Sequence, residues 1–109
     1  MLRGSLTAVP EEDGVEFAYE LRPVGEAVDL TFRDGCQADV VVTAGEEDVW
    51  RYSEGRMFTQ ALIERTVEPD ETLSFSFTWS DPEPGSYRAT AHLRTMNGPR
   101  NEASTTFEI

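Results

Sequence analysis

The sequence predicts an all-β protein, an antiparallel β-sandwich of about eight or nine short strands. Apolar and polar residues alternate with the period of a half-buried strand, and turn-forming residues recur about every ten positions. Only one short stretch has helical spacing. The 109 residues are enough for one hydrophobic core, so we expect residues 1–109 to form a single domain.

The first half of the chain contains four strand patterns. Residues 6–9 form a weak one, which the acidic turn at 10–14 closes. Strict alternation predicts half-buried strands at 15–22 and 28–33, each followed by a turn that contains glycine. Residues 38–43 are β-branched and almost continuously apolar, so both faces of this strand should be covered.

The stretch 49–62 changes period at its middle. Its first four residues alternate as a strand does, and its last six have the spacing of a short helical turn, near residues 57–62. We expect this apolar segment to close one end of the sandwich as a structural corner; the alternative is a loop that contacts a partner. The expected corner residues are Asp39, Trp50, Tyr52, Ser53, Phe58, Leu62, Trp79 and Tyr87.

A hairpin across the loop at 44–48 would pair Thr43 with Val49 and would bring Asp39 opposite Ser53. A carboxylate on that face of a sheet needs a partner. Asp39 is therefore predicted to accept hydrogen bonds from Ser53 or from a nearby backbone amide. The alternative is a solvated acid at the edge of the sheet.

The second half of the chain predicts four more strands. Alternation puts Trp79 in the core and Tyr87 in an inward-facing row, whereas His92 falls in the outward-facing row. A loop at 96–102 contains the turn-forming pair Asn-Gly. The strands are expected at residues 63–67, 73–79, 87–93 and 103–109.

The charge of the chain is strongly negative. Asp and Glu number 21, the nine basic residues are all arginine, and the formal net charge is −12. Such a surface repels itself until salt screens the charges, so we hypothesise a salt-rich cytoplasm, as in an extreme halophile. A G+C-biased genome would explain the missing lysine but not the excess of acid. The same charge disfavours nucleic acid and anionic membranes as partners.

No feature of the sequence predicts catalysis, a metal or a cofactor. A Ser-His-Asp site would need His92, but the sequence has no glycine-framed serine for it to activate. One histidine and one cysteine are too few ligands for a zinc site. The acidic turns at 11–13 and 46–48 lack the spacing of a calcium loop. Cys36 cannot form an internal disulfide and is expected to be an unreactive thiol. Without an apolar leader or spanning segment, a cytoplasmic monomer is the expectation.

The order of several motifs resembles a known family over roughly four fifths of the chain. The most specific part is Trp-Arg-Tyr-Ser at 50–53, followed by Phe-Thr-Gln-Ala-Leu at 58–62. The other matching parts are 30–32, Asp39, 68–72, Trp79 and 85–89. This order resembles the BsuPI family of intracellular proteinase inhibitors. The chain departs from the family at Ala38, where an aromatic residue is usual, and at Asp70, where glycine is usual.

The resemblance implies an immunoglobulin-like β-sandwich and inhibition of an intracellular subtilisin-type serine protease. An inhibitor of this kind presents a rigid, extended loop that adds to the protease cleft. Proteases of this type generally accept apolar residues in the main pocket, which favours Met96 or the pair Met57 and Phe58. The candidate partner-binding residues are Met57 and Phe58 at the rim 55–58, Pro82 and Pro84 in the loop 80–86, and Met96 and Asn97 in the loop 96–101.

A second hypothesis belongs to a different class of protein. The chain would be a non-inhibitory interaction module that binds another protein, or its own copy, through an uncovered sheet edge. The strand at 103–109 carries one charge, Glu108, and is therefore less protected against edge pairing than the acidic strands.

Overall fold

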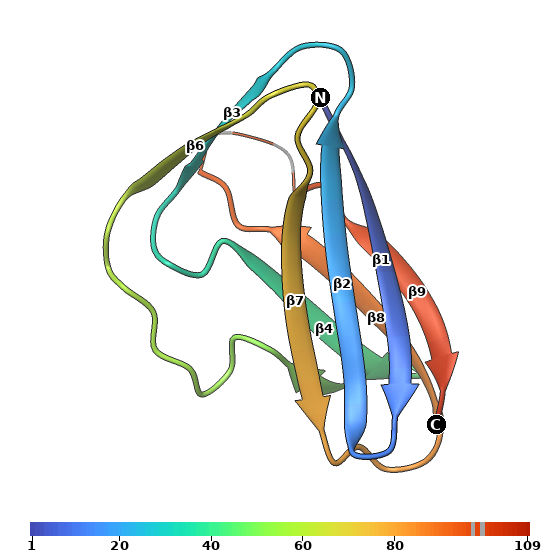
Figure 1. Cartoon of the computed structure of the whole chain (residues 1–109). Helices are drawn as coiled ribbons and strands as arrows, with labels where there is room; N and C mark the ends of the chain where they lie inside the picture. Colours follow the sequence, from blue (N-terminus) through green and yellow to red (C-terminus); the bar gives the residue numbers. More distant parts are fainter. Residues whose placement is uncertain (97, 99) are drawn as a thin grey trace.

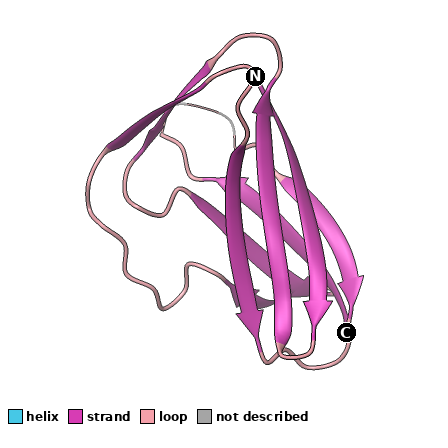
Figure 2. Cartoon of the chain, in the orientation of Figure 1, coloured by secondary structure: helices cyan, strands magenta, loops and turns pink. Residues whose placement is uncertain are grey.

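The computed structural model describes residues 1–96, 98 and 100–109, and these residues form nine strands and no helix (Figures 1 and 2). The antiparallel all-β fold predicted from the alternation is confirmed. The described residues therefore contain no helix that could span a membrane. The strands are β1 (Leu2–Glu11), β2 (Gly14–Pro23), β3 (Val28–Phe32), β4 (Ala38–Ala44), β5 (Glu47–Arg51), β6 (Ile63–Val67), β7 (Leu73–Ser80), β8 (Ser86–Leu93) and β9 (Ala103–Glu108).

The strands form two layers and a side ribbon. One sheet has the order β1-β2-β7 and the other β5-β4-β8-β9, while β3 pairs with β6 alone. In Figure 1 the three-stranded sheet lies in front of the four-stranded one, with the β3–β6 ribbon at the upper left. The loop after β7 and the loop after β8 therefore lie at opposite ends of the sandwich.

Strand β2 shows how the sequence pattern produces this arrangement. Its alternate side chains Val15, Phe17, Tyr19 and Leu21 are at most 1% exposed, while the residues between them face outward. The hydroxyl of Tyr19 donates to the backbone carbonyl of Asn101, next to β9, and so joins the two layers. Burial raises the pKa of Tyr19, so the hydroxyl remains a neutral donor.

Aromatic rings from both sheets meet in the core. Trp50 of β5 stacks on Phe17 of β2 and on Trp79 of β7, with ring centroids 6.1 and 5.9 Å apart. Trp79 also meets the ring of Tyr87 at 5.0 Å, edge to face. Pairs of this kind add about 0.5–1.5 kcal/mol to the effect of burial alone. The placement of Trp79 and Tyr87 between the layers agrees with the pattern of the sequence.

Two strand details differ from the expectation. Strand β1 begins at Leu2 and runs through Pro10, because Leu2 is buried and proline is tolerated on an edge strand. The hairpin β4–β5 has an irregularity after Val42, so Thr43 lies opposite Asp48 and not opposite Val49. On the other side of the irregularity, away from the loop, Val42 lies opposite Trp50, as in the simple hairpin.

The helical turn expected near residues 57–62 is wrong. Residues 56–62 have no regular secondary structure. Met57 and Leu62 are 98% and 63% exposed, so they do not plug the end of the sandwich. The carbonyl of Thr59 accepts a hydrogen bond from the amide of Gly35, 2.9 Å away, in place of a partner within a helix. Two pairs of apolar residues four positions apart, Phe58 with Leu62 and Met57 with Ala61, do not make a helix when no core faces them.

His92 lies on the outer face of β8, as the alternation predicts, but the expected exposure of its side chain to solvent is wrong. His92 is only 7% exposed and lies opposite Asp39 in the β4–β8 ladder. The chain after β8 turns back, and the carbonyl of Arg100 accepts a hydrogen bond from Leu93 at 2.7 Å. Alternation identifies the two faces of β8, but it does not reveal that the outer face is covered at His92.

Candidate partner-binding surface

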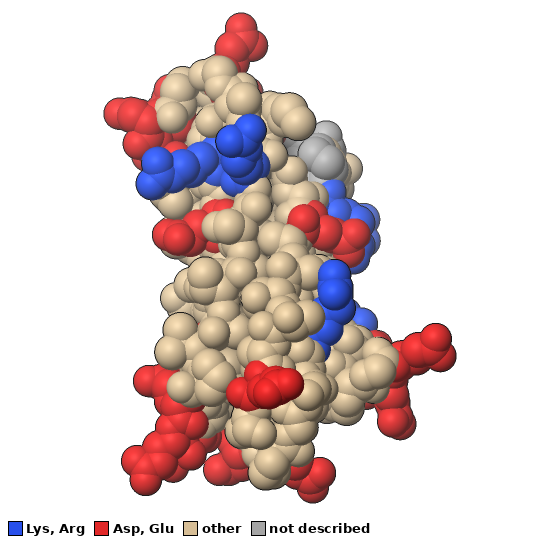
Figure 3. All heavy atoms as spheres, turned by 90° about the vertical axis from the view of Figure 1, so that its right-hand side faces the viewer, with Lys and Arg blue, Asp and Glu red and all other residues tan. Residues whose placement is uncertain are grey.

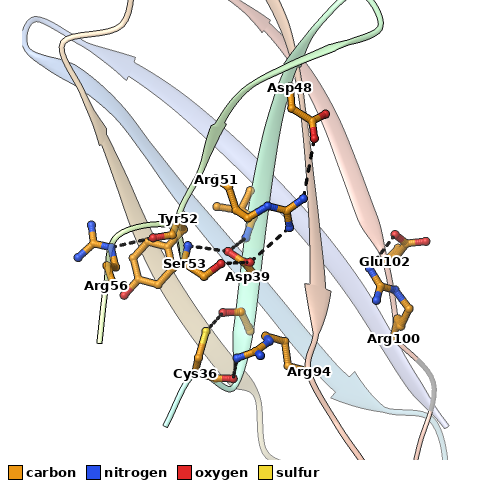
Figure 4. Close-up of polar contacts among 12 residues, drawn as sticks. Cys36, Asp39, Asp48, Arg51, Tyr52, Ser53, Arg56, Arg94, Arg100 and Glu102 are labelled. Atoms are coloured by element: carbon orange, nitrogen blue, oxygen red, sulfur yellow. Dashed lines mark hydrogen bonds and ion pairs between the residues drawn. The ribbon is translucent and has the colours of Figure 1, made fainter. Parts of the chain in front are cut away.

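Asp39 of β4 binds Ser53, just after the end of β5, and so joins this part of the chain to β4. We call these contacts the Asp39 clamp. Its Oδ1 accepts from the amides of Val40 and Ser53 at 2.9 and 3.0 Å, and its Oδ2 accepts from Ser53 Oγ at 2.5 Å. Arg51 adds an ion pair at 3.6 Å (Figure 4). Asp39 is 3% exposed, and these contacts satisfy a carboxylate that burial would otherwise penalise. The predicted hydrogen bonds between Asp39 and Ser53 are confirmed.

The segment 53–62, which we call the Met57 segment, is anchored on both sides of Met57. Arg56 Nε donates to the carbonyl of Tyr52 at 2.8 Å, and its guanidinium lies 4.3 Å from the centroid of the Tyr52 ring. Phe58 packs on the same ring at 6.4 Å, and Tyr52 is supported in turn by Phe77 at 4.7 Å. Met57 itself is 98% exposed. The supports therefore hold an apolar side chain out into solvent.

Two neighbouring hollows connect the Met57 segment to the loop after β8. The first, of about 460 Å³, includes Met57 and Arg56 in its lining, and the second, of about 250 Å³, includes Met96. Asp34 and Arg94 line both hollows. The structure thus brings together two methionines, Met57 and Met96, that lie far apart in the sequence. Asn97, the other residue expected in this loop, lies outside the described residues.

This surface has an unusual charge for so acidic a chain. Four of the nine arginines line the two hollows, against a single acid, Asp34. We call the residues that line the two hollows the arginine face. Its arginines come from three separate loops of the chain: Arg33 follows β3, Arg56 follows β5, and Arg94 and Arg100 follow β8.

Arg94 is held in place by neighbouring groups. Its Nη1 pairs with Asp34 Oδ1 at 3.2 Å. The same nitrogen donates to the carbonyl of Cys36 at 3.1 Å (Figure 4). Asp34 also accepts from the amide of Cys36 at 2.9 Å, which fixes the turn before β4. The Cys36 thiol is buried, and burial raises its pKa, so the thiol stays protonated and unreactive.

His92 lines the second hollow. Burial lowers the pKa of His92, and the nearby charge of Arg100 lowers it further. The imidazole is therefore neutral near pH 7. Among the described residues, no group of three His, Cys, Asp or Glu side chains is placed to hold a metal ion.

Pro82 and Pro84 lie at the opposite end of the sandwich from Met96. The amide of Asp81 donates to the carbonyl of Asp13, and the backbones of Gly85 and Ile109 bond to each other. Acidic side chains dominate this end. Figure 3 shows acidic side chains that project from the lower part of the molecule. We call it the acidic end, and its exposed acids are Glu11, Glu12, Asp13, Glu46, Glu47, Asp48, Asp81, Glu83 and Glu108.

Comparison with known proteins gives a family and a fold. The model of the BsuPI family, intracellular proteinase inhibitors, matches residues 2–98. The CARDB domain of the PF1109 protein from Pyrococcus furiosus, in complex with di-metal ions, superposes with a TM-score of 0.53 at 14% identity, over 99% of this chain and 91% of that one. The solution structure of the same domain gives 0.50 at 16% identity, over 98% and 92%. A comparison with curated proteins gives no match. The fold is an immunoglobulin-like β-sandwich.

Proposed function

The chain belongs to the BsuPI family of intracellular proteinase inhibitors, and we propose that it inhibits a subtilisin-type serine protease through the Met57 segment. The observation that carries this proposal is the 98% exposure of Met57 between anchored neighbours. A protease of this type takes an apolar side chain into its main pocket. Met57 offers such a side chain within a segment that has no regular secondary structure. The chain itself is expected to have no enzyme activity.

Anchoring of the Met57 segment favours tight binding. A loop that is already ordered loses less conformational entropy when a protease closes around it. The Asp39 clamp at Ser53 and the backbone bond from Gly35 to Thr59 fix the segment on either side of Met57. The same anchors would oppose separation of the two ends if the protease cut between them.

The other two candidate loops have less support as the principal contact. The amide of Met96 donates to the carbonyl of Thr31 at 2.8 Å, so this residue is paired to the edge of β3, and it is 53% exposed. Pro82 and Pro84 stiffen their loop, but they present no large apolar side chain for a pocket and lie amid the acidic end. Met96 lies on the arginine face and would meet the rim of the same protease.

The direct test is a titration of a subtilisin-type protease with the folded chain in concentrated KCl. Residual peptidase activity and the integrity of the chain are followed together. Stoichiometric loss of activity with an intact chain is expected. The Met57→Ala variant should raise the inhibition constant about 100-fold, which corresponds to about 2.7 kcal/mol at a hot spot.

Two matched variants separate the loops. Met96→Ala should raise the inhibition constant by no more than about fivefold, because rim contacts contribute little. Val9→Ala, which removes an exposed apolar side chain from β1, should leave inhibition unchanged. Equal inhibition by Met57→Ala and the unaltered chain would remove the Met57 segment from the proposal.

We further propose that the protein works as a monomer in a salt-rich cytoplasm. The acidic end crowds nine exposed carboxylates, and such crowding destabilises a compact fold unless salt screens it. An extreme halophile provides that environment. The family description, intracellular, agrees with the cytoplasmic site of action.

The second candidate is a non-inhibitory interaction module that pairs through a sheet edge. The supporting observation is that β9 is the outer strand of its sheet and carries only Glu108 as a charge. Sedimentation at increasing protein concentration tests for self-pairing at this edge. If the protein is a monomer at all concentrations and inhibits the protease stoichiometrically, the interaction module is excluded and the inhibitor proposal stands.

A further inference from the structure

We infer that the hollow lined by Arg33, Arg94 and Arg100 is a subsite for carboxylates, which receives an acidic segment of the protein partner beside the Met57 contact. This inference rests on the proposed function, because it names the chemistry of the partner at the same surface. It adds a second, electrostatic contact to the apolar one.

The first argument is the local balance of charge. The hollow has three guanidinium groups in its lining and one carboxylate, Asp34, in a chain whose net charge is −12. Asp34 is already engaged with Arg94 and with the amide of Cys36. Among the described residues, Arg33 forms no ion pair, and Arg100 has only a loose one with Glu102 at 3.8 Å. Two arginines are therefore available for a new anion.

The second argument is that Arg94 is preorganised. Its contacts with Asp34 and the Cys36 carbonyl hold the guanidinium at the boundary of the two hollows. Because its position is fixed before binding, less side-chain entropy is lost when a carboxylate arrives. Guanidinium groups pair with carboxylates in a forked, two-bond geometry, which gives direction as well as attraction.

The third argument concerns the kind of anion. A hollow of about 250 Å³ suits one or two acidic side chains and not a length of phosphate backbone. Nucleic acid binding requires basic residues along an extended track, and the acidic residues of this chain would repel the rest of the polymer. An acidic protein segment is short enough to reach the hollow and avoid the acidic end.

The fourth argument is continuity with the Met57 contact. Asp34 and Arg94 line both hollows, so the two hollows adjoin. A partner that binds Met57 in the first hollow can therefore reach Arg33 and Arg100 in the second. Direct pairing of these arginines with an acidic segment acts at contact distance, so it remains effective where salt screens the longer-range repulsion between the two proteins. The arginine face would then turn toward the protease and the acidic end would turn away from it.

The experiment uses a fluorescein-labelled hexaglutamate peptide and fluorescence anisotropy. It is done with the full chain at the lowest KCl concentration that keeps the sandwich folded by circular dichroism. Saturable binding is expected, and Arg33→Gln/Arg100→Gln should weaken it at least about tenfold. The control, Arg22→Gln/Arg88→Gln, removes the same charge from β2 and β8, outside both hollows, and should change binding less than about twofold.

Several results would overturn the subsite. These are absence of saturable binding, equal weakening by the control variant, or tighter binding of an oligothymidylate than of the peptide. Protease titrations then separate this inference from the proposed function. Inhibition that Met57→Ala weakens about 100-fold and Arg33→Gln/Arg100→Gln leaves unchanged overturns the subsite alone. Peptide binding by a chain that inhibits no subtilisin-type protease supports the subsite and overturns the proposed function.

Discussion

The loops of the arginine face and of the acidic end are made rigid by different means. At the acidic end, short connections join regular strands, and the loop between β7 and β8 is stiffened by its own prolines. On the arginine face, the Met57 segment has no regular structure and is held by side chains from elsewhere, above all by Asp39 of β4 and Tyr52. Local sequence can supply rigidity in the first case, whereas only tertiary contacts supply it in the second.

The charge differs between the two regions as sharply as the backbone does. Nine exposed acids surround the acidic end, and four arginines line the arginine face. A chain that repels most of its surroundings thus keeps one side on which an acidic partner can approach. The difference suggests that salt stabilises one region and weakens the partner contacts of the other.

The largest effect should come from removal of the Asp39 clamp. Asp39→Ala leaves two backbone amides and the Ser53 hydroxyl without their acceptor and should lower the free energy of unfolding by about 3 kcal/mol. Urea unfolding measures the change. Asp39→Asn keeps one acceptor oxygen and should cost about half as much. Unchanged stability of Asp39→Asn would show that the clamp is not a stabilising contact.

Salt should stabilise the fold through the acidic end. We expect the melting temperature to rise with KCl, because screening reduces repulsion among the exposed acids. Glu11→Gln/Glu12→Gln/Glu83→Gln should make this rise roughly half as steep. Thermal unfolding followed by circular dichroism from low to molar KCl provides the measurement. A flat or falling curve for the unaltered chain would exclude the salt-rich cytoplasm.

Acid should destabilise the fold through His92, which lines the arginine face. The folded-state pKa lies below the ordinary value of about 6.5, so the unfolded chain binds the proton more readily. The contribution of His92 to stability is therefore complete above about pH 6.5 and is lost as the pH falls toward the folded-state pKa. His92→Gln should unfold in urea with less dependence on pH between 7 and 5. An identical dependence in the two proteins would contradict this assignment.

The smallest effect is expected from the proline loop. Pro82→Ala/Pro84→Ala should lower the free energy of unfolding by about 1 kcal/mol, because alanine gives the unfolded chain more freedom. Inhibition of the protease, measured in the same titration as Met57→Ala, should stay within about twofold. A loss of inhibition of tenfold or more would move the principal contact from the Met57 segment to the acidic end.

Much of the fold could be predicted because strand signals are local. The alternation at 15–22 marks β2, and a simple hairpin register was enough to predict that Asp39 meets Ser53. The helical turn at 57–62 failed for a related reason. The spacing of Phe58 with Leu62 and of Met57 with Ala61 is helical, but a helix also requires a buried surface for these residues to face.

The arginine face could not be predicted because its residues are distant in sequence. Arg33 follows β3, Arg56 follows β5, and Arg94 and Arg100 follow β8, so no local pattern links the three segments. The available signal was weak: a chain without lysine has nine arginines to distribute, and the turns at 11–13 and 46–48 contain none of them. Sequence alone named Met57 and Met96 as separate alternatives, and the fold places both on one surface.

The stacking of Trp50 on Trp79 gives the protein an internal optical reporter. The two indoles come from different sheets, and their centroids are 5.9 Å apart with an angle of 21° between the ring planes. Electronic transitions of chromophores held this close couple to one another, and the coupling gives a signed pair of bands in ultraviolet circular dichroism. The pair exists only while the two layers remain docked. Time-resolved dichroism can therefore distinguish closure of the sandwich from formation of its individual sheets, without any added label.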